Sequence, residues 1–178
     1  MTILSDFSVD DFELIVSLPY RVGLHVSYAD DEEGEQDDER EMAALEACLK
    51  AVVVKNEGLT KDVAEKALSM KDKWDGWGQG VFNIEPVCRQ ASEIIARVAS
   101  NDEAKDYVQM VLEVASSVAQ AYGEFGEEPD APKGFLGKAM SRIVGGFGSA
   151  DDEAHPMNVS AAEDSAISRI SAALQAHI

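Results

Sequence analysis

Apolar residues recur every three or four positions along most of the chain. This spacing is typical of amphipathic helices, whose buried face repeats about every 3.6 residues. No stretch of useful length shows the strict apolar–polar alternation of a half-buried strand. The pattern predicts helices over residues 9–29, 37–56, 61–73, 83–98, 101–122 and 160–174. We therefore expect an all-α fold, a helical bundle of about six to seven helices.

Residues that start or stop helices mark several of these boundaries. Ser8 and Thr60 stand where the first and third helices need an N-cap, and Gly58 follows the second helix as a stop signal. Pro86 fits the first turn of the fourth helix. Pro19, in contrast, lies inside the first helix and should kink or restart it.

The length of the chain suits a single domain over residues 1–178. Regular spacing lapses between residues 123 and 158, where prolines and glycines mark a long insertion. Within it, residues 133–148 carry bases and large apolar side chains but no acid. Such a segment fits a helix on a membrane surface or a short helix docked on the protein's own acidic surface. We favour the second, because the chain as a whole would be repelled by anionic lipid.

Two tryptophans lie in the glycine-rich segment 74–80, which we expect to be a loop. Such a pair can stack on a ligand, but large aromatic side chains more often fix a loop to the core. We favour the structural role.

The formal net charge of −19 excludes some partners. Nucleic acid requires clustered Lys and Arg to neutralise its phosphates, so we expect no nucleic-acid binding. The N-terminal residues lack a secretory pattern and no apolar stretch is long enough to span a bilayer, so we expect a cytoplasmic protein. Cys48 and Cys88 fall on apolar helix stripes and are expected to be reduced core residues.

Motifs of catalysis are missing from the sequence. It contains neither Glu-x-x-His nor His-Glu-x-x-His, and no glycine loop followed by Lys-Ser or Lys-Thr. The histidines, His25, His155 and His177, are scattered, and His25 is expected on a helix surface or in the core. We expect a protein that is not an enzyme.

The densest chemical feature is a run of nine carboxylates between residues 30 and 41. Like charges at this density repel strongly unless water, salt or a bound cation screens them. Hard divalent cations such as Ca²⁺, Mg²⁺ and Mn²⁺ prefer several oxygen ligands. The run is not an EF-hand, because Glu35 stands where the sharp turn of that loop needs glycine. Our first-choice ligands are Asp30, Asp31 and Glu41, with Glu35, Asp37 and Asp38 as auxiliaries.

The two ends of the chain resemble each other. Each reads as an apolar helix, a connecting segment, and a second helix with a Glu in its first turns. Glu41 in the first half corresponds to Glu163 in the second, and the apolar positions after each Glu match at a constant offset.

This pattern resembles the tellurite-resistance protein B-like (TerB-like) domain over about residues 16–56 and 106–176. The resemblance implies a small all-helical bundle with two pseudo-symmetric halves, divalent metal binding, and a role in stress or tellurite resistance. Asp30 or Asp31 would stand for the family's Asp, and Glu41 for its Glu. In the second half Glu163 matches the family's Glu, so the resemblance adds it to the candidate metal ligands, but Tyr122 replaces the Asp and only Gly123 agrees.

Two further interpretations remain open for the acidic run. It is equally consistent with a solvated connector whose carboxylates favour the positive end of the second helix. The acidic face is also suited to a basic protein partner, in which case the chain is a helical interaction module that binds no metal.

Overall fold

The computed structural model describes the backbone of residues 1–29, 35–124 and 161–178, and the side chains of these ranges except 35–40 and 122–124. This part contains seven α-helices and no strand, which confirms the all-α prediction. The helices are α1 (Val9–Ser27), α2 (Glu35–Lys55), α3 (Gly58–Ser69), α4 (Trp74–Trp77), α5 (Glu85–Val98), α6 (Asn101–Glu124) and α8 (Ala161–Leu174). Short 3₁₀ turns are η1 (Leu4–Asp6), η2 (Lys71–Lys73), η3 (Val81–Asn83) and η4 (Gln175–His177).

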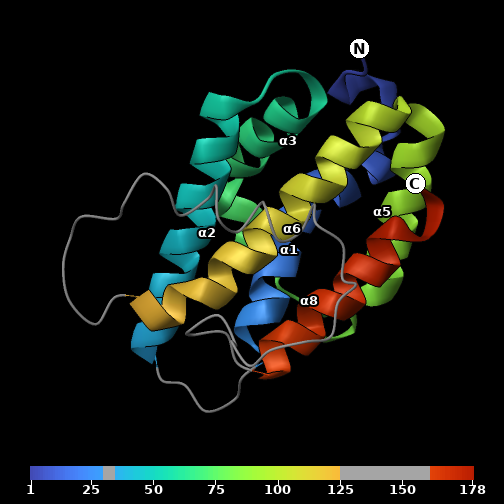
Figure 1. Ribbon diagram of the computed structural model, residues 1–178. Coiled ribbons are helices and arrows are strands. Elements are labelled where there is room, and N and C mark those ends of the chain that lie inside the picture. Colours follow the sequence, from blue (N-terminus) through green and yellow to red (C-terminus); the bar gives the residue numbers. More distant parts are fainter. Residues whose placement is uncertain (30–34, 125–160) are drawn as a thin grey trace.

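Helices α1 and α6 form the middle of the bundle (Figure 1). Helices α2 and α3 pack together on one side of this pair, and α5 and α8 pack together on the other. Side chains of all seven helices meet in one largely aliphatic core, to which the short α4 contributes Trp77 and whose fully buried members include Leu18, Leu49, Ile95, Met110 and Leu174. The long insertion proposed at 123–158 lies almost wholly outside the described residues.

Helix α1 runs through Pro19 without restarting, contrary to one form of the sequence prediction. Proline has no N–H, so it cannot donate the usual helical hydrogen bond to the carbonyl of Ile15, four residues earlier. The hydroxyl of Tyr107 on α6 donates to this carbonyl instead, at 2.9 Å. The helix therefore continues because a side chain from another helix replaces the missing donor.

Helix boundaries agree with the prediction in part. The Ser8 hydroxyl accepts a hydrogen bond from the backbone N–H of Asp11, as an N-cap should. Thr60 is not a cap: α3 already begins at Gly58, and Thr60 lies buried in its first turn. Gly58 has a φ of 64°, a left-handed conformation that glycine adopts without steric cost, so the chain enters the next helix earlier than predicted.

The segment with two tryptophans is partly helical rather than a loop, because α4 occupies Trp74–Trp77. The Trp74 indole N–H donates to the carbonyl of Ala67 at 3.1 Å, and its ring stacks on Tyr20 with centroids 4.6 Å apart. The Trp77 indole N–H donates to the carboxylate of Glu13 at 3.2 Å. Both rings therefore fix this segment to α1 and α3, as expected from the structural interpretation.

Both cysteines are free and buried, in agreement with the prediction. Burial raises the pKa of Cys48 to about 11 and that of Cys88 to about 12, so both thiols stay protonated near neutral pH. His25 is also buried, with Nδ1 2.8 Å from the carbonyl oxygen of Val81. Since a carbonyl only accepts, this nitrogen is the donor.

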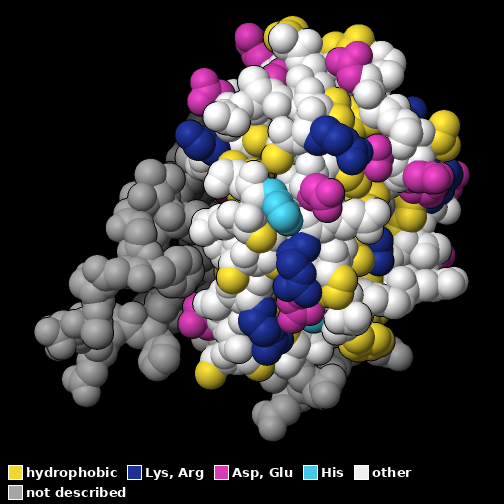
Figure 2. Space-filling view, turned by 90° about the vertical axis from the view of Figure 1, so that its right-hand side faces the viewer, with side chains coloured by type: hydrophobic (Ala, Val, Ile, Leu, Met, Phe, Trp, Pro, Cys, Tyr) yellow, Lys and Arg dark blue, Asp and Glu magenta, His cyan; other side chains and the backbone are white. Residues whose placement is uncertain are grey.

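The face formed on the side of α5 and α8 carries both signs of charge. Figure 2 shows Lys and Arg side chains along the middle of this face with Asp and Glu side chains beside them. Ion pairs join the helices here: Arg169 to Glu85 at 3.2 Å and Arg97 to Asp11 at 3.1 Å. None of the helices in the described part is both long and apolar enough to cross a membrane.

Candidate functional site

Four helix ends gather at one end of the bundle. Helices α1 and α6 end there, and α2 and α8 begin there (Figure 1). The helix ends that precede and follow residues 30–34, and those that precede and follow residues 125–160, therefore lie at the same end of the bundle. The two halves that resemble each other in sequence thus correspond to two helix pairs, α1 with α2 and α6 with α8, whose adjoining ends lie at the same end of the bundle.

Both glutamates singled out by the sequence comparison of the two halves are buried. Glu41, in the second turn of α2, is 2% exposed, and Glu163, in the first turn of α8, is 3% exposed. Glutamate is rarely buried to this extent unless its charge is compensated, because burial removes the carboxylate from water. Both lie near helix N-termini, where the helix dipole favours negative charge.

The other predicted ligands are placed less completely. Asp30 and Asp31 lie outside the described residues. Glu35, Asp37 and Asp38 lie on the first turn of α2, so they belong to a helix and not to a free loop, but their side chains are outside the described part. Acidic residues favour a helix N-terminus, which explains why α2 begins at Glu35, two residues before the predicted start.

Within the described side chains, no three of His, Cys, Asp and Glu lie close enough together to hold a metal ion. Of the seven predicted ligands, this part includes the side chains of Glu41 and Glu163 only. Tyr122 and Gly123, the second-half counterparts of the first-half Asp and its neighbour, lie on the last turn of α6.

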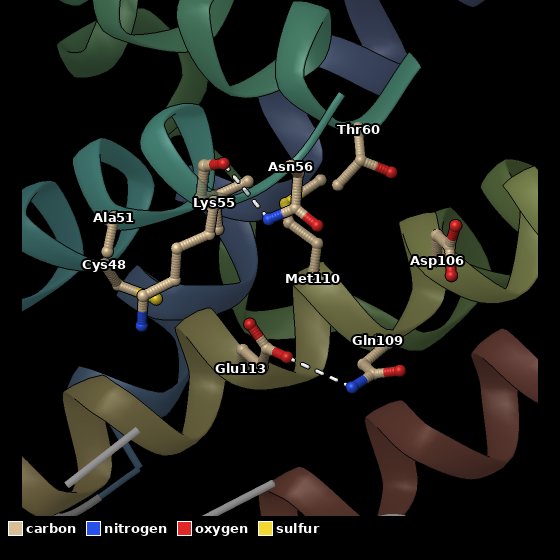
Figure 3. Close-up of a pocket in the computed structure, with 10 residues that line it drawn as sticks. Cys48, Ala51, Lys55, Asn56, Thr60, Asp106, Gln109, Met110 and Glu113 are labelled. Carbon is tan, nitrogen blue, oxygen red and sulfur yellow. Dashed lines mark hydrogen bonds between the residues drawn. The ribbon is translucent and has the colours of Figure 1, made fainter. Parts of the chain in front are cut away.

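A pocket of about 350 Å³ lies elsewhere, where α2 and the start of α3 face α6 (Figure 3). Its floor includes the buried residues Cys48, Val52 and Met110. Polar side chains form the rest of the lining: Lys55, Asn56, Thr60, Asp106, Gln109 and Glu113. The volume is at the lower end of the range for small-molecule sites, about 300–1,000 Å³.

Glu113 is a half-buried carboxylate in the lining of this pocket. Partial burial raises the pKa of its carboxyl group, opposed by a hydrogen bond from Gln109 and by the charge of Lys55. Gln109 Nε2 donates to Glu113 Oε1 at 3.2 Å (Figure 3). Because the Cys48 thiol stays protonated, the pocket offers polar and charged contacts to a ligand but no thiolate nucleophile.

Sequence reasoning did not find this pocket. The available signal was the spacing of Asp106, Gln109 and Glu113, which recur every three or four residues and so share one face of α6 beside Met110. That spacing is equally typical of an ordinary solvated helix face. Only the packing of α2 across it creates a concave surface.

Comparison of the chain with protein-family models, with curated proteins and with solved structures gave no match in any of the three searches.

Proposed function

We propose that this chain is a non-enzymatic helical domain that binds a divalent cation at the end of the bundle where α2 and α8 begin. Glu41 and Glu163 are the proposed inner ligands. Asp30 and Asp31 are the proposed ligands from the first connection, and Glu35, Asp37 and Asp38 are auxiliaries.

The observation that carries the proposal is the burial of Glu41 and Glu163. A glutamate on a solvated connector would project into water, whereas these two residues are 2% and 3% exposed. Their positions correspond in the two halves of the chain, and their helices begin at the same end of the bundle. Carboxylate oxygens are the ligands that hard divalent cations prefer, so two buried glutamates at one end of the bundle are suited to contribute to a single cation site.

Burial also favours a cation over the interaction-module interpretation. A basic protein partner contacts side chains that reach the surface, and an ion pair needs its two charged groups within about 4 Å. A cation without its hydration shell is small enough to reach a buried carboxylate. By the resemblance to TerB-like domains, the bound metal would serve stress or tellurite resistance.

Thermal unfolding of the metal-free protein tests the proposal. A cation that binds only the folded state raises the melting temperature, by roughly 5–10 °C at a hundredfold excess over the dissociation constant. We expect such a rise with Ca²⁺, Mg²⁺ or Mn²⁺ beyond that of NaCl at equal ionic strength, and saturable binding by calorimetry. The NaCl arm is needed because any salt screens repulsion in a chain of net charge −19.

Variants distinguish cation binding at a defined site from a general attraction of cations to acidic residues. Asp31→Asn combined with Glu41→Gln, and Glu163→Gln alone, should each abolish saturable binding. Glu93→Gln, which removes an exposed carboxylate from α5, should leave it unchanged. The proposal is wrong if none of the three cations binds saturably, or if all of these variants bind like the original chain.

A further inference from the structure

The pocket between α2 and α6 lies away from the proposed metal end. Among the lining residues on α2, Cys48 is the nearest to Glu41. The two are seven residues apart, which is about 10 Å along the helix axis at a rise of about 1.5 Å per residue. The pocket therefore requires an explanation of its own.

Two carboxylates are spaced along one wall of this pocket. Asp106 and Glu113 are separated by two turns of α6, about 10 Å along the helix axis. Met110 lies between them and is 2% exposed, and Val52 of α2 contributes a second buried apolar surface. The wall thus presents a negative group, an apolar strip and a second negative group in sequence.

Neither carboxylate has an ion-pair partner within the described part of the protein, because no Lys or Arg there forms an ion pair with Asp106 or Glu113. The neighbour that hydrogen bonds to Glu113 is the neutral amide of Gln109. The Glu113 carboxylate is half-buried, accepts its hydrogen bond from a neutral amide and lies near Lys55 without an ion pair to it, so it would gain from a cationic ligand in direct contact.

We propose that this pocket binds a short linear diamine, with one ammonium group at Glu113, the other at Asp106, and the methylene chain against Met110 and Val52. The amide of Gln109, and that of Asn56 on the opposite wall, flank the ligand (Figure 3). The overall negative charge of the chain attracts such a cation from solution.

Lys55 distinguishes this ligand from an anionic or zwitterionic one. Its ammonium group lies near enough to Glu113 to influence that carboxyl group, without forming an ion pair with it. A bound carboxylate or phosphate would use Lys55 as its main partner. A diamine is instead repelled by Lys55, so removing this charge should strengthen diamine binding.

Putrescine is the probe, and NMR chemical-shift titration of the full-length protein is the measurement. The side-chain amide signals of Asn56 and Gln109 should shift saturably, which places the ligand in the pocket and not at the acidic residues 30–41. Butylamine, with the same carbon chain and one ammonium group, should bind roughly tenfold more weakly, because it lacks one charge-assisted contact.

Substitutions of acidic and of basic pocket residues should change the affinity for putrescine in opposite directions. Glu113→Gln and Asp106→Asn should each weaken putrescine binding by roughly tenfold and remove its advantage over butylamine. Lys55→Met should strengthen it severalfold, and the exposed control Glu93→Gln should have no effect. Both pocket carboxylate variants are close in shape to the original residues, and circular dichroism confirms that they fold.

The proposal is overturned if putrescine causes no saturable shift of the Asn56 and Gln109 amides, or if butylamine binds equally well. Weaker putrescine binding after Lys55→Met would likewise overturn it, since a dication seated beside Glu113 should bind more tightly once the positive charge of Lys55 is removed. These outcomes are independent of the metal proposal, whose residues lie at the other end of α2.

Discussion

The Tyr107 side chain supplies a hydrogen-bond donor to a backbone carbonyl far away in the sequence. It is completely buried, and burial raises the pKa of its hydroxyl well above the usual value, so the group remains a neutral donor. Its hydrogen bond compensates for the N–H that Pro19 lacks, at the Ile15 carbonyl in the middle of α1. The sequence reveals the proline but not its compensation, because Tyr107 is separated from Ile15 by 92 residues.

Tyr107→Phe should lower the free energy of unfolding by about 1–2 kcal/mol, because it leaves a buried carbonyl without a donor. Pro19→Ala restores an N–H that can donate to the same carbonyl within α1. In the Pro19→Ala background, the loss caused by Tyr107→Phe should therefore fall to less than half. Urea unfolding of the four proteins measures this coupling. Equal losses in the two backgrounds would show that the hydroxyl does not replace the proline's missing donor.

At the scale of elements, the close crossing of α1 and α2 depends on Gly23. A Cβ atom at this position would lie 2.4 Å from Leu45 Cδ1 and 3.3 Å from Val114 Cγ1. Leu45 and Val114 are fully buried, so neither side chain has free space to move into. The helical stripe predicted α1 but gave no indication that this glycine sets its distance from α2.

Gly23→Ala should destabilise the protein by about 1 kcal/mol, since the clash outweighs the better helix propensity of alanine. Gly76, on the exposed side of α4, is the matched control, because a Cβ there would meet nothing within 4 Å. Gly76→Ala should stabilise the protein by about 0.5–1 kcal/mol through propensity alone. Denaturant unfolding of both variants tests the pair, and a stabilising Gly23→Ala would contradict the packing argument.

The start of α6 is joined to the N-terminal segment by Glu103. Its carboxylate accepts hydrogen bonds from the backbone N–H of Thr2 at 2.7 Å and from the backbone N–H of Ser100 at 3.0 Å. The hydroxyls of both residues also donate to it. These bonds favour the charged form and lower the pKa of Glu103 from 4.5 to about 2, with the Thr2 N–H as the largest cause.

This lowered pKa predicts a pH dependence of stability. The contribution of Glu103 is complete above pH 4.5 and is lost as the pH falls from 4.5 towards 2, because the unfolded chain takes up the proton first. Glu103→Gln should cost about 1 kcal/mol at pH 7, a small value because solvent screens a partly exposed group. The difference between the original protein and the variant should shrink between pH 4.5 and pH 2, as measured by urea unfolding. A difference that is constant with pH would refute the role of its charge, and Glu93→Gln provides the exposed control.

At the scale of the whole molecule, the arrangement of the helices places Glu41 and Glu163 towards the same end of the bundle. It also makes a polar face of α6 into one wall of the pocket. Glu41 and Glu163 approach the same end because α1 and α6 run through the middle and their partners return from that end. The Asp106–Glu113 face becomes a pocket wall because α2 crosses it. The two proposed sites therefore depend on the same pair of packed helices, at different levels along their length.

The sequence by itself determined the helical class, the approximate helix ranges, the burial of both cysteines and the correspondence of Glu41 with Glu163. These features depend on local periodicity, composition and spacing, which a single chain displays directly. The tertiary structure decided that both glutamates are buried, that Tyr107 completes the helix at Pro19, and that a pocket forms beside Glu113. Each of these depends on contacts between residues far apart in the chain, and helical periodicity specifies which face of a helix is buried but not which partner covers it.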